Sequence, residues 1–177
     1  MKTKFGLFIV FFSLAFTFSS CSNNDDDPVN VTEGDIAGVW NIVDLQQQAT
    51  VTTTANGQTI TATNSTVGSN YNMTYNFSTN PNTVEANGTI IGIVTATVDG
   101  QSTTEEVPIE AFGDINNGTW SLNGSTITIS DGVTSIDATV QEYSISRMVL
   151  FYQFDITTDL LGVTFSTVGS STIILER

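Results

Sequence analysis

Apolar and polar residues alternate most clearly over residues 71–78, YNMTYNFS. Successive side chains of a β-strand point to opposite faces, so this pattern predicts a strand with one buried face and one face in contact with water. The side chains expected on the buried face are Tyr71, Met73, Tyr75 and Phe77.

A β-hairpin is predicted over residues 118–129, GTWSLNGSTITI. Its central Asn-Gly pair suits a two-residue turn with positive φ at both positions, which would place Trp120 opposite Ile127. The Asp-Gly pair at 131–132 predicts a second turn of this kind, with Ile136 opposite Ile127. The three side chains would then form one row across three neighbouring strands, as in a β-meander.

Short apolar or alternating runs, separated by Gly, Asn and Asp, continue along the rest of the chain without helical periodicity. We expect about eight to ten antiparallel strands in total. A sheet of that size closes or splits in two, because long open edges aggregate. The prediction is therefore an all-β fold, an antiparallel up-and-down meander barrel, with a β-sandwich as the alternative. Further strands are expected at 39–54, 59–66, 84–98, 102–112, 134–146, 147–157 and 171–177.

The N-terminal residues 1–20 have the pattern of a secretion signal peptide. Lys2 and Lys4 precede an apolar run at 5–18, which is shorter than the roughly 20 residues of a membrane-spanning helix. Two serines stand directly before Cys21, and this arrangement resembles the lipobox of bacterial lipoproteins. The resemblance implies cleavage before Cys21, acylation of its sulfur and its amine, and stable attachment to the lipid bilayer.

Residues 21–33 follow as a polar, acidic and flexible tether that starts at the lipidated cysteine. Its run of Asp25, Asp26 and Asp27 resembles the export signal of surface lipoproteins in the Bacteroidetes. That resemblance implies a lipid-anchored protein of the outer membrane that faces the cell exterior. A simpler interpretation is that the aspartates only keep the tether solvated.

The domain at 34–177 opens with DIAGVW, which places Gly38 and Trp40 on the first strand. A Gly-x-Trp at this place resembles the lipocalins and related calycin barrels. Together with the lipobox and the acidic tether, the whole chain resembles the lipocalin-like lipoproteins of the Bacteroidetes. The resemblance implies that Trp40 closes one barrel end, that Arg177 stacks on it, and that the barrel holds one ligand without performing a reaction.

Composition narrows the function classes further. The 177 residues contain 18 Asp and Glu but only 4 Lys and Arg, for a net charge of −14, so nucleic-acid binding is excluded. The chain has no histidine and one cysteine, which argues against a Ser-His or Cys-His hydrolase and against a thiolate metal site. We therefore expect no enzyme activity, no cofactor and no metal.

Arg147 lies in SISRMVLFYQFDI, a segment with apolar residues on both faces. It could hold the carboxylate of a lipid-like ligand, or it could pair with Asp155, Asp159 or an aromatic ring. A ligand-lined lumen and a packed core have the same sequence pattern, so both interpretations stay open. The candidate ligand-binding residues are Trp40, Tyr71, Met73, Tyr75, Phe77, Trp120 and Arg147.

Two hypotheses for the function follow. In the first, the protein is an outer-membrane-anchored, surface-exposed lipocalin-like lipoprotein that binds a small apolar ligand. In the second, it is a filled β-barrel or sandwich with no ligand in its lumen, which recognises a protein or a glycan at the cell surface.

Overall fold

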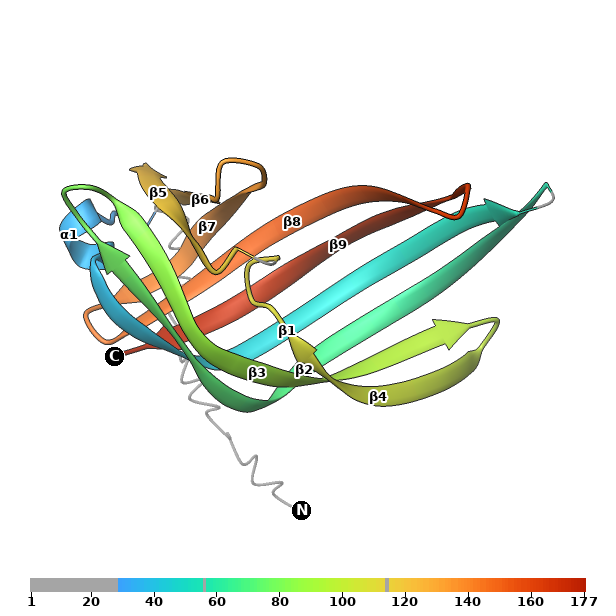
Figure 1. The fold of residues 1–177 in the computed structure, drawn as a ribbon. Coiled ribbons are helices and arrows are strands. Elements are labelled where there is room, and N and C mark those ends of the chain that lie inside the picture. Colours follow the sequence, from blue (N-terminus) through green and yellow to red (C-terminus); the bar gives the residue numbers. More distant parts are fainter. Residues whose placement is uncertain (1–28, 56, 114) are drawn as a thin grey trace, which may run out of the picture.

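The computed structural model describes residues 29–55, 57–113 and 115–177 (Figure 1). The predicted signal peptide, Cys21 and the three aspartates lie outside these ranges. The described chain forms one short helix and nine strands, which confirms the predicted all-β class. The elements are α1 (Glu33–Ile36), β1 (Gly38–Ala55), β2 (Gln58–Ser78), β3 (Thr83–Val98), β4 (Gln101–Ile109), β5 (Asn117–Asn123), β6 (Thr126–Ser130), β7 (Ser135–Ser144), β8 (Arg147–Leu160) and β9 (Val163–Glu176).

The nine strands form one antiparallel sheet in the order β2-β1-β9-β8-β7-β6-β5-β3-β4. A further pairing between β2 and β3 closes the sheet into a ring, with β4 attached beside β3. Most neighbours in space are also neighbours in sequence, so the sheet is the predicted meander. The exceptions are the pairings of β1 with β9 and of β3 with β5.

The ring is closed at only one end of the molecule. β3 pairs with β5 through Thr83–Glu85, but its other half, Ile90–Val98, pairs with β4. β7 in turn pairs with β8 only as far as Thr139 and Phe151. Beyond these points the sheet continues as an open, curved sheet of β4, β3, β2, β1, β9 and β8, which projects away from α1 (Figure 1).

The hairpin between β5 and β6 differs from its predicted register by two residues. Asn123 stays in the strand and pairs with Thr126, so the turn consists of Gly124 and the serine after it. Only Gly124 has positive φ in this turn, as in a turn with glycine at its first central position. Trp120 therefore lies opposite Ile129, and because the shift is an even number of residues, the buried face is unchanged.

The connection between β6 and β7 is a four-residue loop and not the predicted two-residue turn. The carboxylate of Asp131 accepts hydrogen bonds from the backbone N–H groups of Val133 and Thr134, at 2.8 and 2.7 Å, and this closes the loop. Ile136 consequently pairs with Ile129, so the predicted row across three strands exists with a different central member.

β2 is one long strand where the sequence predicted two, at 59–66 and 71–78. A bulge between Gly68 and Asn70 shifts its register against β3 without ending the strand. The predicted strand at 102–112 is too long at its end. β4 stops at Ile109, and the residues that follow leave the sheet.

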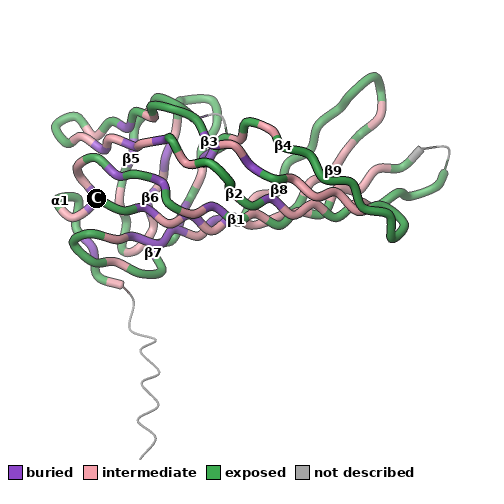
Figure 2. The backbone as a smooth tube through the Cα atoms, turned by 90° about the horizontal axis from the view of Figure 1, so that it is seen from below, coloured by how far each residue is buried: buried purple, intermediate pink, exposed green. Residues whose placement is uncertain are grey.

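The hydrophobic core fills the closed end of the ring, while the projecting strands are mostly half-buried or exposed (Figure 2). The core begins earlier in the chain than the predicted domain boundary at residue 34, because Val29 and Val31 already pack against it. Thr32 directly precedes α1, and its backbone N–H and hydroxyl both donate to the Asp35 carboxylate, each at 2.8 Å. The last part of the predicted tether therefore belongs to the folded domain.

Candidate functional site

Most of the predicted ligand-binding residues lie together in the core of the closed end. Trp40, Met73, Tyr75, Phe77 and Trp120 are each no more than 4% exposed. Tyr75 and Phe77 lie on the buried face of β2, as the alternation predicted, and the Phe77 ring meets the Trp120 ring edge-on at 5.7 Å between centroids. These side chains pack on one another and on the surrounding aliphatic residues.

Phe112 completes this core, and the sequence analysis did not single it out. The segment after β4 turns inward and buries Phe112 fully, with its ring edge-on to Tyr75 at 4.9 Å and tilted against Tyr152 at 6.0 Å. The Tyr152 hydroxyl donates a 2.8 Å hydrogen bond to the carbonyl of Ala111, which holds the segment in place. The sequence signal that could have indicated this inward turn is the pair Pro108 and Gly113, two strand-breaking residues on either side of the segment.

Tyr71 lies at the edge of the core beside the bulge in β2. Its hydroxyl accepts a 3.2 Å hydrogen bond from the backbone N–H of Leu45 and lies 3.1 Å from the Asp44 carboxylate and 2.9 Å from the Gly68 carbonyl. Burial is the main cause that raises the pKa of Tyr71 above its ordinary value. The hydroxyl is therefore a neutral structural group that joins β1 to the bulge.

Trp40 and Arg177 meet at the closed end of the ring. The guanidinium carbon lies 4.0 Å from the centroid of the indole ring, and the Trp40 Nε1–H donates to the carbonyl of Ile36 at 2.8 Å. Arg177 also donates to the carbonyls of Asp35 and Ala37, at 2.6 and 2.9 Å. The cation therefore covers the tryptophan and fixes α1 to the end of β9.

Arg147 is not placed to hold a ligand in the core. It starts β8 at the turn from β7, and its guanidinium forms an ion pair with Glu142. The side chains of Arg147 and Glu142 are 40% and 64% exposed, respectively. The proposed pairing with Asp155 or Asp159 is wrong, because those residues lie farther along β8 while the hairpin register brings Glu142 close.

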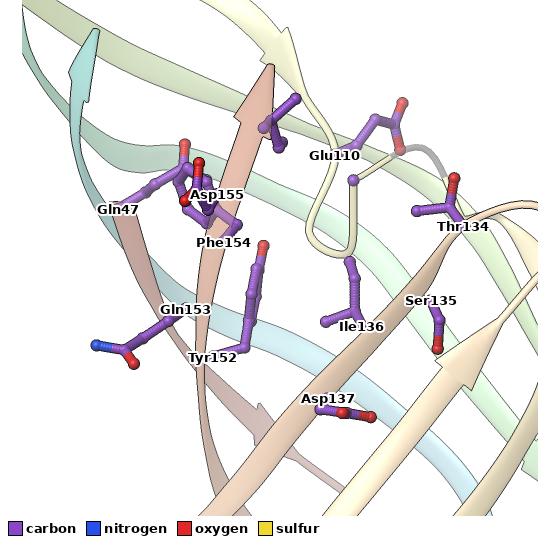
Figure 3. A pocket seen from close by; sticks show the side chains of 12 residues that line it. Gln47, Glu110, Thr134, Ser135, Ile136, Asp137, Tyr152, Gln153, Phe154 and Asp155 are labelled. Carbon is purple, nitrogen blue, oxygen red and sulfur yellow. The ribbon is translucent and has the colours of Figure 1, made fainter. Parts of the chain in front are cut away.

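A cleft with a volume of about 480 Å³ opens where β7 and β8 separate (Figure 3). β8 contributes one wall, and the start of β7 contributes the other. Figure 3 shows Tyr152 and Ile136 facing the space between these walls, with the segment at 110–113 above it. The lining residues are Gln47, Glu110, Gly113, Thr134, Ser135, Ile136, Asp137, Tyr152, Gln153, Phe154, Asp155 and Ile156.

The cleft combines apolar and acidic side chains. Its apolar part consists of Ile136, Phe154 and Ile156, together with the buried ring of Tyr152, and Ile156 is 52% exposed. Burial raises the pKa of Tyr152 above its ordinary value, so the hydroxyl stays protonated. The acidic side chains are Glu110, Asp137 and Asp155, and no lysine or arginine lines the cleft in the described part of the chain.

None of the seven predicted ligand-binding residues lines this cleft, whose residues come from β1, the loop between β6 and β7, β7, β8 and the segment after β4. Within residues 29–55, 57–113 and 115–177, no group of His, Cys, Asp and Glu side chains is arranged to hold a metal ion. In the same ranges, no helix has the length and apolar character needed to cross a bilayer.

No family model, curated protein or solved structure matches the chain.

Proposed function

We propose that this protein is a lipid-anchored binding protein of the outer membrane, without enzyme activity, that holds a small ligand in the cleft between β7 and β8. The observation that carries the proposal is the position of the cleft beside a filled core. The volume of about 480 Å³ is in the range of small-molecule sites, and aromatic and polar side chains both reach it.

We also propose that the chain is a lipocalin-like lipoprotein. The contact between Arg177 and the Trp40 ring supports this proposal, because the resemblance to lipocalins implies that pair. The filled interior around Phe112 departs from the ligand-holding lumen that the same resemblance implied. The ligand site is accordingly assigned to the side of the barrel.

The lining of the cleft indicates the chemistry of its ligand. Ile136, Phe154 and Ile156 offer an apolar surface, which suits an apolar ligand body. Glu110 and Asp155 would repel a carboxylate, and Arg147 is already paired with Glu142. A ligand whose polar end is neutral or cationic fits this arrangement better than a fatty acid.

The ligand assignment is testable on protein purified from its own outer membrane. Native mass spectrometry should show one stoichiometric adduct that organic solvent removes. Replacing Ile156 by Gln should weaken retention of the adduct by about tenfold or more, because an apolar contact in the cleft is lost. Ile156 is half-exposed, so the fold does not depend on it.

Val67→Gln is the matched control, because Val67 is similarly exposed on β2 and does not line the cleft. It should keep the adduct at the wild-type level. A bare wild-type mass, or equal loss of the adduct in both variants, would contradict a ligand in this cleft and favour the recognition of a protein or glycan.

The cellular location is tested through the N-terminal residues. Cys21→Ala should move the protein from the membrane fraction to the soluble fraction, because the acylation site is removed. Changing Asp25, Asp26 and Asp27 to Asn should keep the membrane attachment but abolish digestion by protease added to whole cells. Unchanged fractionation of the cysteine variant would refute the lipid anchor, and unchanged digestion of the aspartate variant would refute the export signal.

A further inference from the structure

The outer edge of β8 is free from the cleft to the end of the strand. β8 pairs with β9 along its whole length, but its pairing with β7 ends at Phe151. From Tyr152 to Leu160, no strand of the described chain pairs with β8 on the β7 side. A strand edge of this length leaves a row of backbone donors and acceptors ready to pair with another extended chain.

The hydrogen-bonding direction along β8 identifies which backbone groups are free. The N–H of Arg177 donates to the carbonyl of Ser146 at 3.1 Å, so this pair is a hydrogen-bonded one. In an antiparallel ladder, hydrogen-bonded and non-hydrogen-bonded pairs alternate, and the register between β8 and β9 continues without a shift. The groups that point to the free edge are therefore the N–H and C=O of Gln153, Asp155, Thr157 and Asp159.

The side chains beside this edge differ on the two faces of the sheet. Phe154, Ile156 and Leu160 continue the inward row of β8, and the last two are 52% and 60% exposed. Asp155 and Asp159 lie on the opposite face, four positions apart. The cleft places two further carboxylates, those of Glu110 and Asp137, near this edge. No lysine or arginine of the described residues lines it.

Another open edge of the sheet, on β4, is less suited to pairing. Pro108 lies within β4 and has no backbone N–H to donate. β8 has no proline between Tyr152 and Leu160. The two edges are therefore not equivalent, and the β8 edge is the one with an uninterrupted set of backbone groups.

The charge of the edge indicates the partner. A second copy of this chain would bring two acidic edges together, because the net charge is −14 and Asp155 and Asp159 lie at the contact. The chain has only Lys2, Lys4, Arg147 and Arg177 as cations, so none of its segments places two cations four residues apart. A basic extended segment of another protein complements the edge.

We propose that the free edge of β8 pairs with an extended segment of a partner protein that carries Lys or Arg at two positions four residues apart, on the same face as Asp155 and Asp159. Apolar residues at the alternate positions of that segment would face Phe154 and Ile156. The main-chain pairing supplies affinity and the two cations supply selection, as in other cases of strand addition. This goes beyond the small ligand of the cleft and does not depend on it.

A capped nine-residue peptide tests the proposal against the full-length protein. It alternates Thr and Val, with Lys in place of the third and seventh residues, and its binding is measured by fluorescence anisotropy. We expect binding to the wild-type protein. Two control peptides should fail to bind. The first has Glu in place of both Lys, which reverses the charge. The second keeps both Lys but has N-methyl groups on the residues whose N–H would face β8, which blocks the backbone hydrogen bonds of the ladder.

Two variants of equal charge change give the matched comparison. The double variant Asp155→Asn with Asp159→Asn should bind the Lys peptide with an affinity roughly fivefold or more below that of the wild type. Glu105→Gln with Glu106→Gln, on β4, should leave the affinity within about twofold of wild type, because exposed charges away from a site contribute little. All four side chains are on the exposed part of the sheet, so the fold should survive both changes.

Several results would overturn the proposal. These are no binding of the Lys peptide, equal binding of the N-methylated peptide, and equal weakening in both double variants. A dimer of the protein alone in sedimentation velocity would instead assign the edge to a second copy. Phe154, Asp155 and Ile156 take part in both sites. The peptide is therefore tested on protein from which organic solvent has removed any adduct, and the adduct is measured separately, so the two proposals fail separately.

Discussion

Phe112→Ala is expected to lower the free energy of unfolding by about 3 to 5 kcal/mol, as is usual when a buried phenylalanine is truncated. The side chain is fully buried and contacts the rings of Tyr75 and Tyr152, so its removal leaves a cavity in the centre of the closed end. Chemical denaturation followed by tryptophan fluorescence measures the loss, because Trp40 and Trp120 both lie in this core.

The same variant tests whether Phe112 is what fills the barrel. Benzene or xenon should bind in the new cavity of Phe112→Ala, because that cavity is apolar and about the size of one aromatic ring. Phe151→Ala on β8 provides a control outside the core, since Phe151 is half-buried and absent from the core cluster. A loss below about 1 kcal/mol in Phe112→Ala would mean that the segment after β4 does not fill the barrel.

Gly88→Ala is expected to lower the free energy of unfolding by about 3 kcal/mol or more, because backbone strain and a direct steric clash act together. Gly88 lies in β3 with φ of +106°, and a Cβ atom there would lie 1.8 Å from the carbonyl oxygen of Asn72 in β2. The backbone of one strand would have to move away from the other. Since the pairing of β2 with β3 closes the ring, the whole sheet should lose stability.

Gly124→Ala separates strain from clash in the same assay. Gly124 also has positive φ, at +61°, but nothing lies within 4 Å of the added carbon. It should lower the free energy of unfolding by only about 1 to 2 kcal/mol, the strain of an alanine with positive φ. Equal losses in the two variants would show that the close approach of β2 and β3 at Gly88 is not what excludes a side chain.

The alternation in residues 71–78 predicted a buried face correctly because that pattern is local. Met73, Tyr75 and Phe77 are all buried, and only backbone geometry within the strand is needed to place them on one side. The hairpin after Trp120 was predicted as a hairpin but in the wrong register. The choice between Asn-Gly and Gly-Ser as the turn is decided by the pairing of the two strands, which the turn sequence alone does not contain.

Phe112 and the cleft were missed for a different reason. Residues 102–112 have a strand-like composition, and the exit from the sheet after Ile109 depends on contacts with Tyr152, which lies 41 positions from Ala111 along the chain. The cleft depends on where β7 and β8 separate, and its walls come from distant segments. No periodicity within either strand marks that point, so this site becomes visible only when the strands are placed in space.

The pairing of β1 with β9 also sets the order of events during biosynthesis. Asn41 in β1 donates to the carbonyl of Glu176 in β9, across a separation of 135 residues. The ring therefore cannot close while β9 is still being synthesised, and contacts this distant in sequence form slowly. Until then the long β1–β2 hairpin has no partner on one side, so a chaperone that holds the unfinished chain should be needed to keep that strand from pairing elsewhere.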